Sequence, residues 1–479
     1  MTPRDSPAKN PRITCVATHA GQAGGAAIAM ERLAAGLRGA GAQVDMVTRA
    51  ASAWPPAVRH LDRRIRRRIR HSRTLLSNTL FTADWPAWDV AGHPAVANCD
   101  LVNIHWVAGF LGAEGLRRII RSGRPVAWTL HDMRGFTGGC HYAAGCEGFT
   151  AGCTACPQLA PPLAYLPARS LSRARRRLRG LPLTFVTPSR WLAGELTRSS
   201  LFDPVSHDVR VIPNGIDLGR FAPGDRTQAR ERLGLPADGF TILLGSISLE
   251  ERRKGGAVAV EAIRRMVASL AGDRSAQPAP VVVTYGSGPP PIPGVACRHL
   301  GTVTEQGVRE ALHACDIHLT MAREDNLPNT VMEALACGVP VLAARAGGLP
   351  EMVDDGVTGW LVEVDDTEHA AALLTELVRD PSRAALAGRQ GRRQAESEWD
   401  VAVQASRYLD LARELNLRGT SHLGTGSTRS IAAQSAGIHA VSPALITPAV
   451  AVIAHPAQPL RGPLRRVRRL TSRSSKRAS

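Results

Sequence analysis

The sequence predicts an α/β protein with two Rossmann-like, doubly wound domains and a disordered basic C-terminal tail. Two successive series of short apolar runs alternate with helical patterns along the 479 residues, which is typical of parallel sheets joined by crossover helices. A turn dipeptide, Asn214-Gly215, lies in the loop between the two series. A chain of this length has room for two or three domains, each with a hydrophobic core.

The first predicted domain spans residues 12–218. It opens with RITCVAT (12–18), a loop rich in Gly and Ala, and AAIAMERLAAGL (26–37), whose Leu, Ile and Met recur at helical spacing. Gly39 and Gly41 predict the end of this helix before the next strand. The strands expected in this domain lie at 12–18, 43–48, 101–106, 125–130, 183–187 and 208–213.

The second predicted domain spans residues 219–384 and repeats the alternation of strand and helix. A further helix, at 385–416, is expected to return to the first domain. The expected strands of the second domain lie at 240–245, 281–286, 316–321, 339–343 and 359–363. Its expected helices lie at 256–270, 305–314, 330–337 and 367–379.

Both ends of the chain are expected to be disordered. Residues 1–11 precede the first strand, and residues 417–479 are rich in Ser, Thr, Ala, Pro and Gly, with no Asp or Glu and no sustained period. No apolar run approaches the roughly 20 residues of a membrane span, and no signal-peptide pattern opens the sequence. We therefore expect a cytoplasmic protein, with peripheral attachment to the inner face of the plasma membrane as a further expectation.

The formal net charge of +18 is concentrated in three arginine-rich segments, 59–73, 169–179 and 457–479, which carry +7, +6 and +8. The rest of the chain is therefore close to neutral. Such segments suit an anionic membrane surface or a phosphate-bearing acceptor as well as nucleic acid. The arginine blocks have no interleaved aromatic residues, aromatic content is 4%, and no recognition motif occurs, so we expect no nucleic-acid partner.

The first arginine-rich segment lies within WPPAVRHLDRRIRRRIRHSRTLL (54–76). Four apolar residues recur there at helical spacing among the arginines: Val58, Leu61, Ile65 and Ile69. A basic amphipathic helix of this kind binds interfaces rich in anionic lipid. An equally good interpretation is a surface helix whose narrow apolar stripe packs on its own domain.

The most informative stretch is REDNLPNTVMEALACGVPVLAARAGGLPEMV, residues 323–353. A polar loop leads through Pro328 into a short predicted helix that carries Glu333, so polar groups gather at a helix N-terminus on the carboxyl edge of a sheet. This stretch resembles the retaining glycosyltransferases of the GT-B fold, family 4, whose signature is two Glu separated by seven residues. Here the spacing ends on Glu333 and begins on Asp325. The resemblance covers about residues 12–415 and implies two domains that face each other across a cleft.

The resemblance implies roles for several residues of this stretch. Asp325 is expected among the catalytic residues, at the hydroxyls of the donor sugar, and Glu333 at the ribose hydroxyls of the donor. A loop-capping Asp and a Glu that complements a helix dipole are the alternative interpretations. The other donor-binding candidates are Asn326, Leu327, Pro328, Asn329 and Thr330.

A second element is GSISLEERRKGG (245–256), between a predicted strand and a helix. Its resemblance to the family implies that Lys254 grips the nucleotide diphosphate and stabilises charge on the leaving oxygen, which would be the largest catalytic contribution in such chemistry. The place of the family's usual Arg is taken by Ser246, so Arg253 or Arg252 is expected to substitute. A solvated basic loop is the alternative.

Two further segments suggest site residues. Gly24 and Gly25 precede a helix, where glycines let the backbone approach a phosphate or sugar; a plain tight turn is an equal alternative. The stretch WTLHDMRGFTGGCHYAAGCEGFTAGCTACPQL resembles a family subset that builds exopolysaccharide, of the colanic-acid type. This resemblance implies that His131 is catalytic, beside the donor sugar and the acceptor hydroxyl. His105 and Asp132 are expected on the acceptor side, with a turn cap as the alternative for Asp132.

Four of the nine cysteines cluster in a predicted insert at 133–160. They are Cys140, Cys146, Cys153 and Cys156. In a reducing compartment we favour a four-thiolate structural zinc site over disulfides, and unligated thiols stay open as an alternative. No catalytic metal is expected, because the resemblance implies none and no Asp-x-Asp motif occurs.

These features predict a retaining glycosyltransferase that moves a sugar from a nucleotide diphosphate sugar to a glycan or polyprenyl-linked acceptor, in exopolysaccharide or cell-surface glycan synthesis. No carboxylate is placed as a nucleophile, so we expect front-face displacement. Two alternatives stay open. One is a related sugar- or lipid-binding protein without transfer activity, and the other is a nucleic-acid-binding protein that uses the arginine segments.

Overall fold

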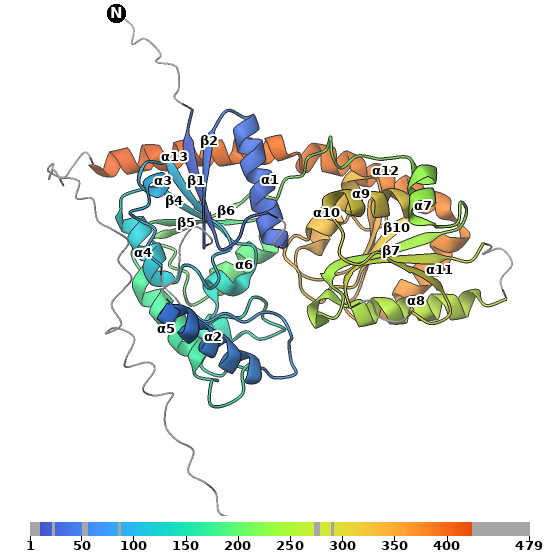
Figure 1. Cartoon of the computed structure of the whole chain (residues 1–479), viewed down its shortest axis with the longest axis horizontal. Helices are drawn as coiled ribbons and strands as arrows, with labels where there is room; N and C mark the ends of the chain where they lie inside the picture. The colour runs from blue at the N-terminus through green and yellow to red at the C-terminus, as the bar shows by residue number, and fades with distance from the viewer. Residues whose placement is uncertain are drawn as a thin grey trace, which may run out of the picture. The chain divides into compact units, whose positions relative to one another are not determined.

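The computed structural model of the protein describes residues 10–21, 24–49, 56–84, 88–272, 278–288 and 292–423. Two six-stranded sheets organise this part of the chain, and helices from the connecting segments flank each sheet (Figure 1). Every strand pair within the two sheets is parallel. The predicted α/β class with two Rossmann-like domains is therefore confirmed. The disorder predicted for 1–9 and 424–479 falls outside the described residues.

The first sheet has the strand order β2-β1-β3-β4-β5-β6. Its strands are β1 (Arg12–Ala17), β2 (Gln43–Thr48), β3 (Leu101–Ile104), β4 (Val126–Thr129), β5 (Leu183–Thr187) and β6 (His207–Val211). Every residue of β3, β4 and β5 is buried, because helices cover both faces of the sheet. Burial on both faces explains why these strands are mostly apolar and lack the alternation of apolar and polar residues of a half-exposed strand.

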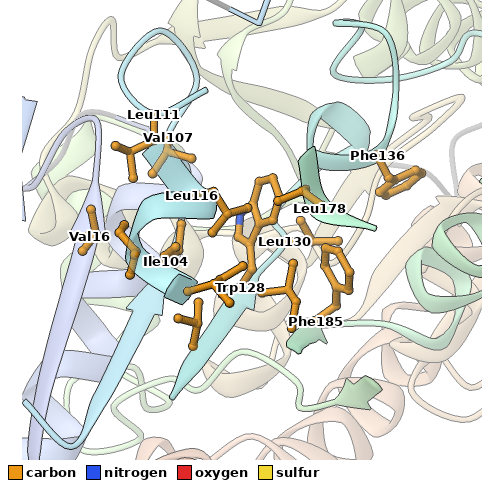
Figure 2. Close-up of a cluster of buried hydrophobic side chains, with 14 of the residues drawn as sticks. Val16, Ile104, Val107, Leu111, Leu116, Trp128, Leu130, Phe136, Leu178 and Phe185 are labelled. Atoms are coloured by element: carbon orange, nitrogen blue, oxygen red, sulfur yellow. The ribbon is translucent and has the colours of Figure 1, made fainter. Parts of the chain in front are cut away.

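Helices and side chains of the first domain pack around this sheet. Its helices are α1 (Gly25–Gly39), α2 (Pro56–His71), α3 (Pro94–Ala97), α4 (Ala113–Arg121), α5 (Leu166–Leu178) and α6 (Arg190–Arg198). On one face, Trp128 of β4 packs with Leu116 of α4 and Leu178 of α5 (Figure 2). The Trp128 ring also stacks on Phe185 of β5, with the ring centroids 5.7 Å apart.

The apolar stripe of α2 packs on its own domain. Ile69 is 5% exposed, and it belongs to a small cluster with Phe81 and Leu159, against which Ile65 also packs. At Ile65 and Ile69 the helix therefore packs on its own domain, as the second of its two interpretations predicted. The first residue of α5, Leu166, packs against the same cluster, so two arginine-rich segments lie on neighbouring helices.

The second sheet has the order β12-β11-β10-β7-β8-β9, which is the Rossmann order 3-2-1-4-5-6 when read from its β9 edge. Its strands are β7 (Thr241–Ser248), β8 (Val281–Ser287), β9 (Ala296–His299), β10 (Ile317–Thr320), β11 (Val341–Ala344) and β12 (Gly359–Val362). Its helices are α7 (Arg226–Leu233), α8 (Gly256–Leu270), α9 (Glu305–Ala314), α10 (Asn329–Ala336), α11 (Thr367–Arg379) and α12 (Pro381–Glu398). The sequence did not predict β9, because all four of its residues are exposed and leave no apolar pattern.

The order of strands reverses direction between β1 and β3 in the first sheet and between β7 and β10 in the second. In open α/β sheets, ligands bind at the carboxyl ends of the strands beside such a reversal. Four of the loops that carry predicted site residues leave these strands. The glycine loop follows β1, His105 follows β3, Lys254 follows β7 and Asp325 follows β10.

The predicted helix at 385–416 was wrong in two respects. It is divided at Trp399 and Asp400 into α12 and α13 (Val401–Leu423), and α13 continues past residue 416, where the tail was predicted to begin. The helix continues through Gly419. A single glycine destabilises a helix by only about 1 kcal/mol relative to alanine, which is too little to end it. No described helix is long and apolar enough to cross a membrane.

Helix α13 packs on the first sheet through Tyr408. Its side chain is fully buried, and its hydroxyl lies 2.8 Å from Thr129 Oγ1. Tyr408 shares a hydrophobic cluster with Ile13 of β1 and with Leu33 and Leu37 of α1. The end of the described chain is thus part of the core of the first domain.

Replacing Tyr408 tests this packing. Tyr408→Ala should lower the free energy of unfolding by about 3–5 kcal/mol, because it leaves a cavity in the core. Tyr408→Phe removes one hydrogen bond and should cost about 1 kcal/mol. Urea denaturation followed by circular dichroism measures both, and Arg407→Ala, at the exposed neighbouring residue, is the control. Equal losses in all three variants would contradict the core position of Tyr408.

Candidate active site

Asp325 is the buried centre of the site. It lies in the loop between β10 and α10, and it is 6% exposed. Lys254 Nζ lies 2.7 Å from its Oδ2, Arg253 Nη1 lies 3.2 Å from the same oxygen, and the Tyr142 hydroxyl donates to Oδ1 at 3.3 Å. Burial opposes ionisation, but the charges of Lys254 and Arg253 hold the pKa of Asp325 well below its usual value. Asp325 is therefore a carboxylate paired with two cations.

A glycine holds the two cations beside Asp325. Lys254 and Arg253 belong to a 3-10 turn, η4 (Arg252–Lys254), which ends at Gly255 with φ +67°. A Cβ on Gly255 would lie 1.7 Å from the carbonyl oxygen of Met321, so the loop after β7 rests on the loop after β10. This close approach directs Lys254 and Arg253 to the same carboxylate.

Of the two arginines predicted to replace the family's usual one, Arg253 is the one that lies beside Asp325. Its Nη1 also donates to Glu324 O at 2.9 Å, and its guanidinium lies 4.0 Å from the Tyr142 ring centroid. Burial opposes the charged form, but Asp325 raises the pKa of Arg253. Arg252 instead donates its backbone N–H to Asn78 Oδ1 at 2.9 Å.

Ser246 does not reach the acids of the site in this structure. It is 8% exposed, and its hydroxyl donates to the carbonyl oxygen of Ser248 at 3.2 Å within β7. The positive charge closest to Asp325 on the loop after β7 thus comes from Lys254 and Arg253.

Glu333 pairs with an arginine of the first domain. Its Oε1 accepts from Arg32 Nη2 at 2.7 Å, and both side chains are about nine-tenths buried. Burial raises the pKa of Glu333, and the charge of Arg32 opposes that rise. Glu333 lies beyond the first turn of α10. The helix dipole acts mainly within the first turn, so the alternative interpretation of Glu333 as an acid that complements this dipole does not hold.

The remaining donor-side candidates contact the first domain or close the start of α10. Asn326 accepts from Ser189 Oγ at 2.6 Å and donates to His131 O at 3.3 Å, and Asn329 donates to Gly25 O at 3.1 Å. Pro328 is the N-cap of α10. Leu327 is part of the apolar core. Thr330 is half-buried in the first turn of α10.

Three helix N-termini at these loops have no side-chain cap. The N-caps of α1, α8 and α10 are Gly24, Gly255 and Pro328, and in the described part of the chain none of them makes a side-chain cap hydrogen bond. In contrast, α6, α7, α9 and α11 have N-caps that accept such a bond, which are Ser189, Asp225, Thr304 and Asp366. Uncapped helix N-termini are suited to binding an anion.

Two neutral histidines extend the site from the first sheet. His105 Nδ1 lies 3.1 Å from His131 Nε2, and the two rings stack with centroids 5.4 Å apart. Burial lowers the pKa of His131 to about 4 and the pKa of His105 well below its usual value. Both imidazoles are therefore neutral near pH 7 and can exchange hydrogen bonds with sugar hydroxyls.

Asp132 caps a turn, which was the alternative interpretation of this residue. It caps a 3-10 turn by accepting from Arg134 N at 2.9 Å, and it also accepts from Trp106 Nε1 at 2.8 Å. Its Oδ2 lies 2.7 Å from His141 Nδ1. All these partners belong to the first domain, so the carboxylate organises the loop that carries His131.

Sequence reasoning missed the residues that join the two sets of loops. Tyr142 contacts Asp325 and Arg253, and the backbone amides of Ala143 and Ala144 donate to Glu324 at 3.1 and 2.9 Å. Glu351 accepts from the backbone amides of Arg190 and Trp191 at 2.8 and 2.7 Å. The only local signals were Glu324 beside Asp325 and Glu351 in GGLPEMV.

Comparison with known proteins defines the class. Residues 23–220 match the family model described as "Glycosyltransferase Family 4", and residues 241–380 match the one described as "Glycosyl transferases group 1". Two Rossmann-like domains with these matches define a glycosyltransferase of the GT-B fold. The chain belongs to glycosyltransferase family 4.

Curated relatives and solved structures agree with this class. A D-inositol 3-phosphate glycosyltransferase of Saccharomonospora viridis is 33% identical over 48% of this chain and 55% of that protein. The putative colanic acid biosynthesis glycosyl transferase WcaC of Escherichia coli is 29% identical over 55% and 65%. The chain spans about half the length of the first curated relatives it matches. The crystal structure of Anabaena HepE with UDP and glucose has the same fold, with a TM-score of 0.55, 15% identity and coverage of 85% and 100%.

The histidine pair should make stability depend on pH. An exposed His in the unfolded chain has a pKa of about 6.5, so below that pH the unfolded chain binds protons that folded His131 does not bind. The free energy of unfolding should fall as the pH drops from 6.5 toward 4, by about 3 kcal/mol from His131 alone. His131→Asn should flatten the profile of urea midpoints against pH. His369→Asn, at an exposed position, should leave it unchanged, and parallel profiles for all three proteins would refute the assignment.

Proposed function

We propose that the protein is a retaining glycosyltransferase that uses a nucleotide diphosphate sugar as donor. The observation that carries this proposal is the pair of cations, Lys254 and Arg253, held on buried Asp325 where the strand order of the second sheet reverses. The uncapped N-termini of α1, α8 and α10 add backbone N–H groups at the same loops. Together these groups suit a diphosphate.

The other donor contacts follow from the same arrangement. Glu333 would accept hydrogen bonds from the donor ribose in place of Arg32, and Asp325 would accept them from the sugar hydroxyls once phosphate takes Lys254. Neutral His131 would contact the sugar and the acceptor hydroxyl from the first domain. The similar fold of HepE, which was crystallised in complex with UDP and glucose, supports a nucleotide donor at such a site.

The transfer step would proceed on one face of the sugar. The acceptor oxygen forms a bond to the anomeric carbon while the bond to the diphosphate oxygen breaks, and the hydroxyl proton passes to a leaving phosphate oxygen. Lys254 and Arg253 stabilise the negative charge that develops on this oxygen. No step needs a catalytic metal, because these side chains supply the positive charge.

The acceptor proposed is a glycan or a polyprenyl-linked glycan, in exopolysaccharide or cell-surface glycan synthesis. The similarity to WcaC supports a polysaccharide product. A membrane-bound acceptor agrees with the exposed arginines of α2 and with those of α5, since the two helices pack on one apolar cluster. The protein would then act at an anionic membrane surface, on its cytoplasmic side.

Ligand-induced thermal shifts test the donor site. UDP, GDP, ADP and inorganic pyrophosphate are each added in excess; a ligand at 100 times its Kd adds about 2.7 kcal/mol. Lys254→Ala should abolish the shifts with all four ligands, because it removes a phosphate contact. Glu333→Gln should abolish only the nucleotide shifts, because the ribose contact is absent from pyrophosphate.

Arg265→Ala is the control, since Arg265 is exposed and pairs only with Glu261 among the described residues. Identical shifts in the wild type and in both site variants would overturn the donor site. With the matching sugar donor, Lys254→Ala should also lower kcat by about 100- to 1000-fold.

Vesicle binding tests the membrane surface. Arg64, Arg67 and Arg176 are exposed on α2 and α5, and each should contribute about 1 kcal/mol to binding of anionic vesicles. Changing all three to Gln should therefore weaken binding roughly a hundredfold in co-sedimentation. A matched variant with Arg264, Arg265 and Arg393 changed to Gln removes the same charge from the second domain. Equal weakening by both variants would show that net charge alone drives binding.

A further inference from the structure

Four cysteines of the first domain share one cavity. Cys140, Cys146, Cys153 and Cys156 line it together with apolar groups such as Phe81 and Phe149. None of the four forms a disulfide. Between Cys140 and Cys156 the only regular element is the 3-10 turn η3 (Gly148–Ala151), so backbone hydrogen bonds alone do little to hold this segment. We call these four residues the thiol cluster.

Backbone N–H groups lie at three of the four sulfurs of the thiol cluster. The backbone N–H of Gly148 donates to Cys146 Sγ at 3.3 Å. Backbone hydrogen bonds from Gly138 reach Cys153, and those from Gln158 and Leu159 reach Cys156. The hydroxyl of Thr137 donates instead to the backbone carbonyl of Cys140, at 2.7 Å. Donors directed at sulfur are the arrangement that a thiolate needs.

The surroundings of the thiol cluster oppose free thiolates. Cys153 is 7% exposed, and the cavity that the four sulfurs share is lined by apolar groups such as Phe81 and Phe149. Four thiolates cannot share such a cavity without a cation between them, because an unpaired charge in apolar surroundings is very costly. A divalent ion that binds sulfur would resolve the conflict between donors that favour thiolate and surroundings that disfavour it.

A half-buried arginine lies next to the thiol cluster. Arg73 interacts electrostatically with Cys140 and Cys156, and its guanidinium lies 5.5 Å from the Phe81 ring centroid. Its Nε and Nη1 are buried and have no hydrogen-bond partner among the described residues. Four thiolates around a divalent ion carry two net negative charges, and Arg73 would balance part of that charge. Unpaired buried N–H groups are costly unless an anion is present.

We propose that the thiol cluster binds one structural zinc ion through its four sulfur atoms. Zinc prefers four thiolates in a tetrahedral arrangement, and the Cys-x2-Cys spacing of Cys153 and Cys156 is typical of such sites. On binding, four S–H bonds break, four protons leave to the solvent and four zinc–sulfur bonds form, with no change of oxidation state. No group of three or more His, Cys, Asp or Glu in the described part of the chain is already placed to hold a metal. The sulfur atoms must therefore draw together around the ion.

The zinc ion would fix the loop that reaches the acids of the candidate active site. Tyr142, Ala143 and Ala144 lie between Cys140 and Cys146, and they donate to Asp325 and Glu324. Ligands at both ends of this short loop would limit its motion. The inference does not rest on the proposed transferase function, because metal binding is measured directly.

Metal content of the full chain tests the proposal. The protein is purified without chelator and analysed by elemental mass spectrometry and by native mass spectrometry. We expect one zinc ion per chain and, after denaturation, nine reactive thiols. Cobalt added to protein from which a chelator has removed zinc should give the strong visible absorption of a tetrahedral thiolate site. Removal of zinc from the wild type should lower its Tm.

Cysteine variants locate the metal. Cys146→Ser and Cys156→Ser should each lose the zinc ion, whereas Cys297→Ser, at an exposed cysteine outside the thiol cluster, should keep it. The wild-type measurements stand even where a variant fails to fold. Absence of zinc with nine reactive thiols would overturn the proposal. Absence of zinc with only five of the nine thiols reactive would overturn it in favour of two disulfides.

Discussion

The burial of one carboxylate, Asp325, constrains the arrangement of the whole site. A buried anion is tolerated only when cations and hydrogen-bond donors surround it, and removal of one partner typically costs several kcal/mol. Asp325 obtains these partners from Lys254 and Arg253 on the loop after β7 and from Tyr142 of the first domain. Three segments distant in sequence are therefore held together by one charge.

The same constraint explains how a donor could bind with little reorganisation. Lys254 and Arg253 are already largely desolvated and oriented by Asp325, so a diphosphate would meet cations whose positions are set before it arrives. On binding, the diphosphate would replace the Asp325 carboxylate as the anion beside Lys254 and Arg253. The same holds for Glu333. Its carboxylate is paired with Arg32, and the hydroxyl groups of the donor ribose would take the place of that arginine.

Sequence reasoning predicted the elements whose signal is local and missed those whose position depends on distant contacts. The interior strands were predicted because burial on both faces leaves mostly apolar runs, whereas exposed β9 left none. Lys254, Asp325 and Glu333 were predicted as site residues from a local motif. Arg32 was not, because its partner Glu333 lies 301 residues away and nothing in its own surroundings marks it.

The loop between Cys140 and Cys146 links the thiol cluster to the acids of the site. On one side it is bounded by sulfur atoms in an apolar cavity, and on the other its backbone amides bind Glu324. Amide donors can bind a carboxylate strongly only when the loop that carries them is held in place, because an ordered loop loses less conformational entropy on contact. A zinc ion bound at the two cysteines would supply that order close to Asp325. The insert is thus better understood as a support for the site than as a separate module.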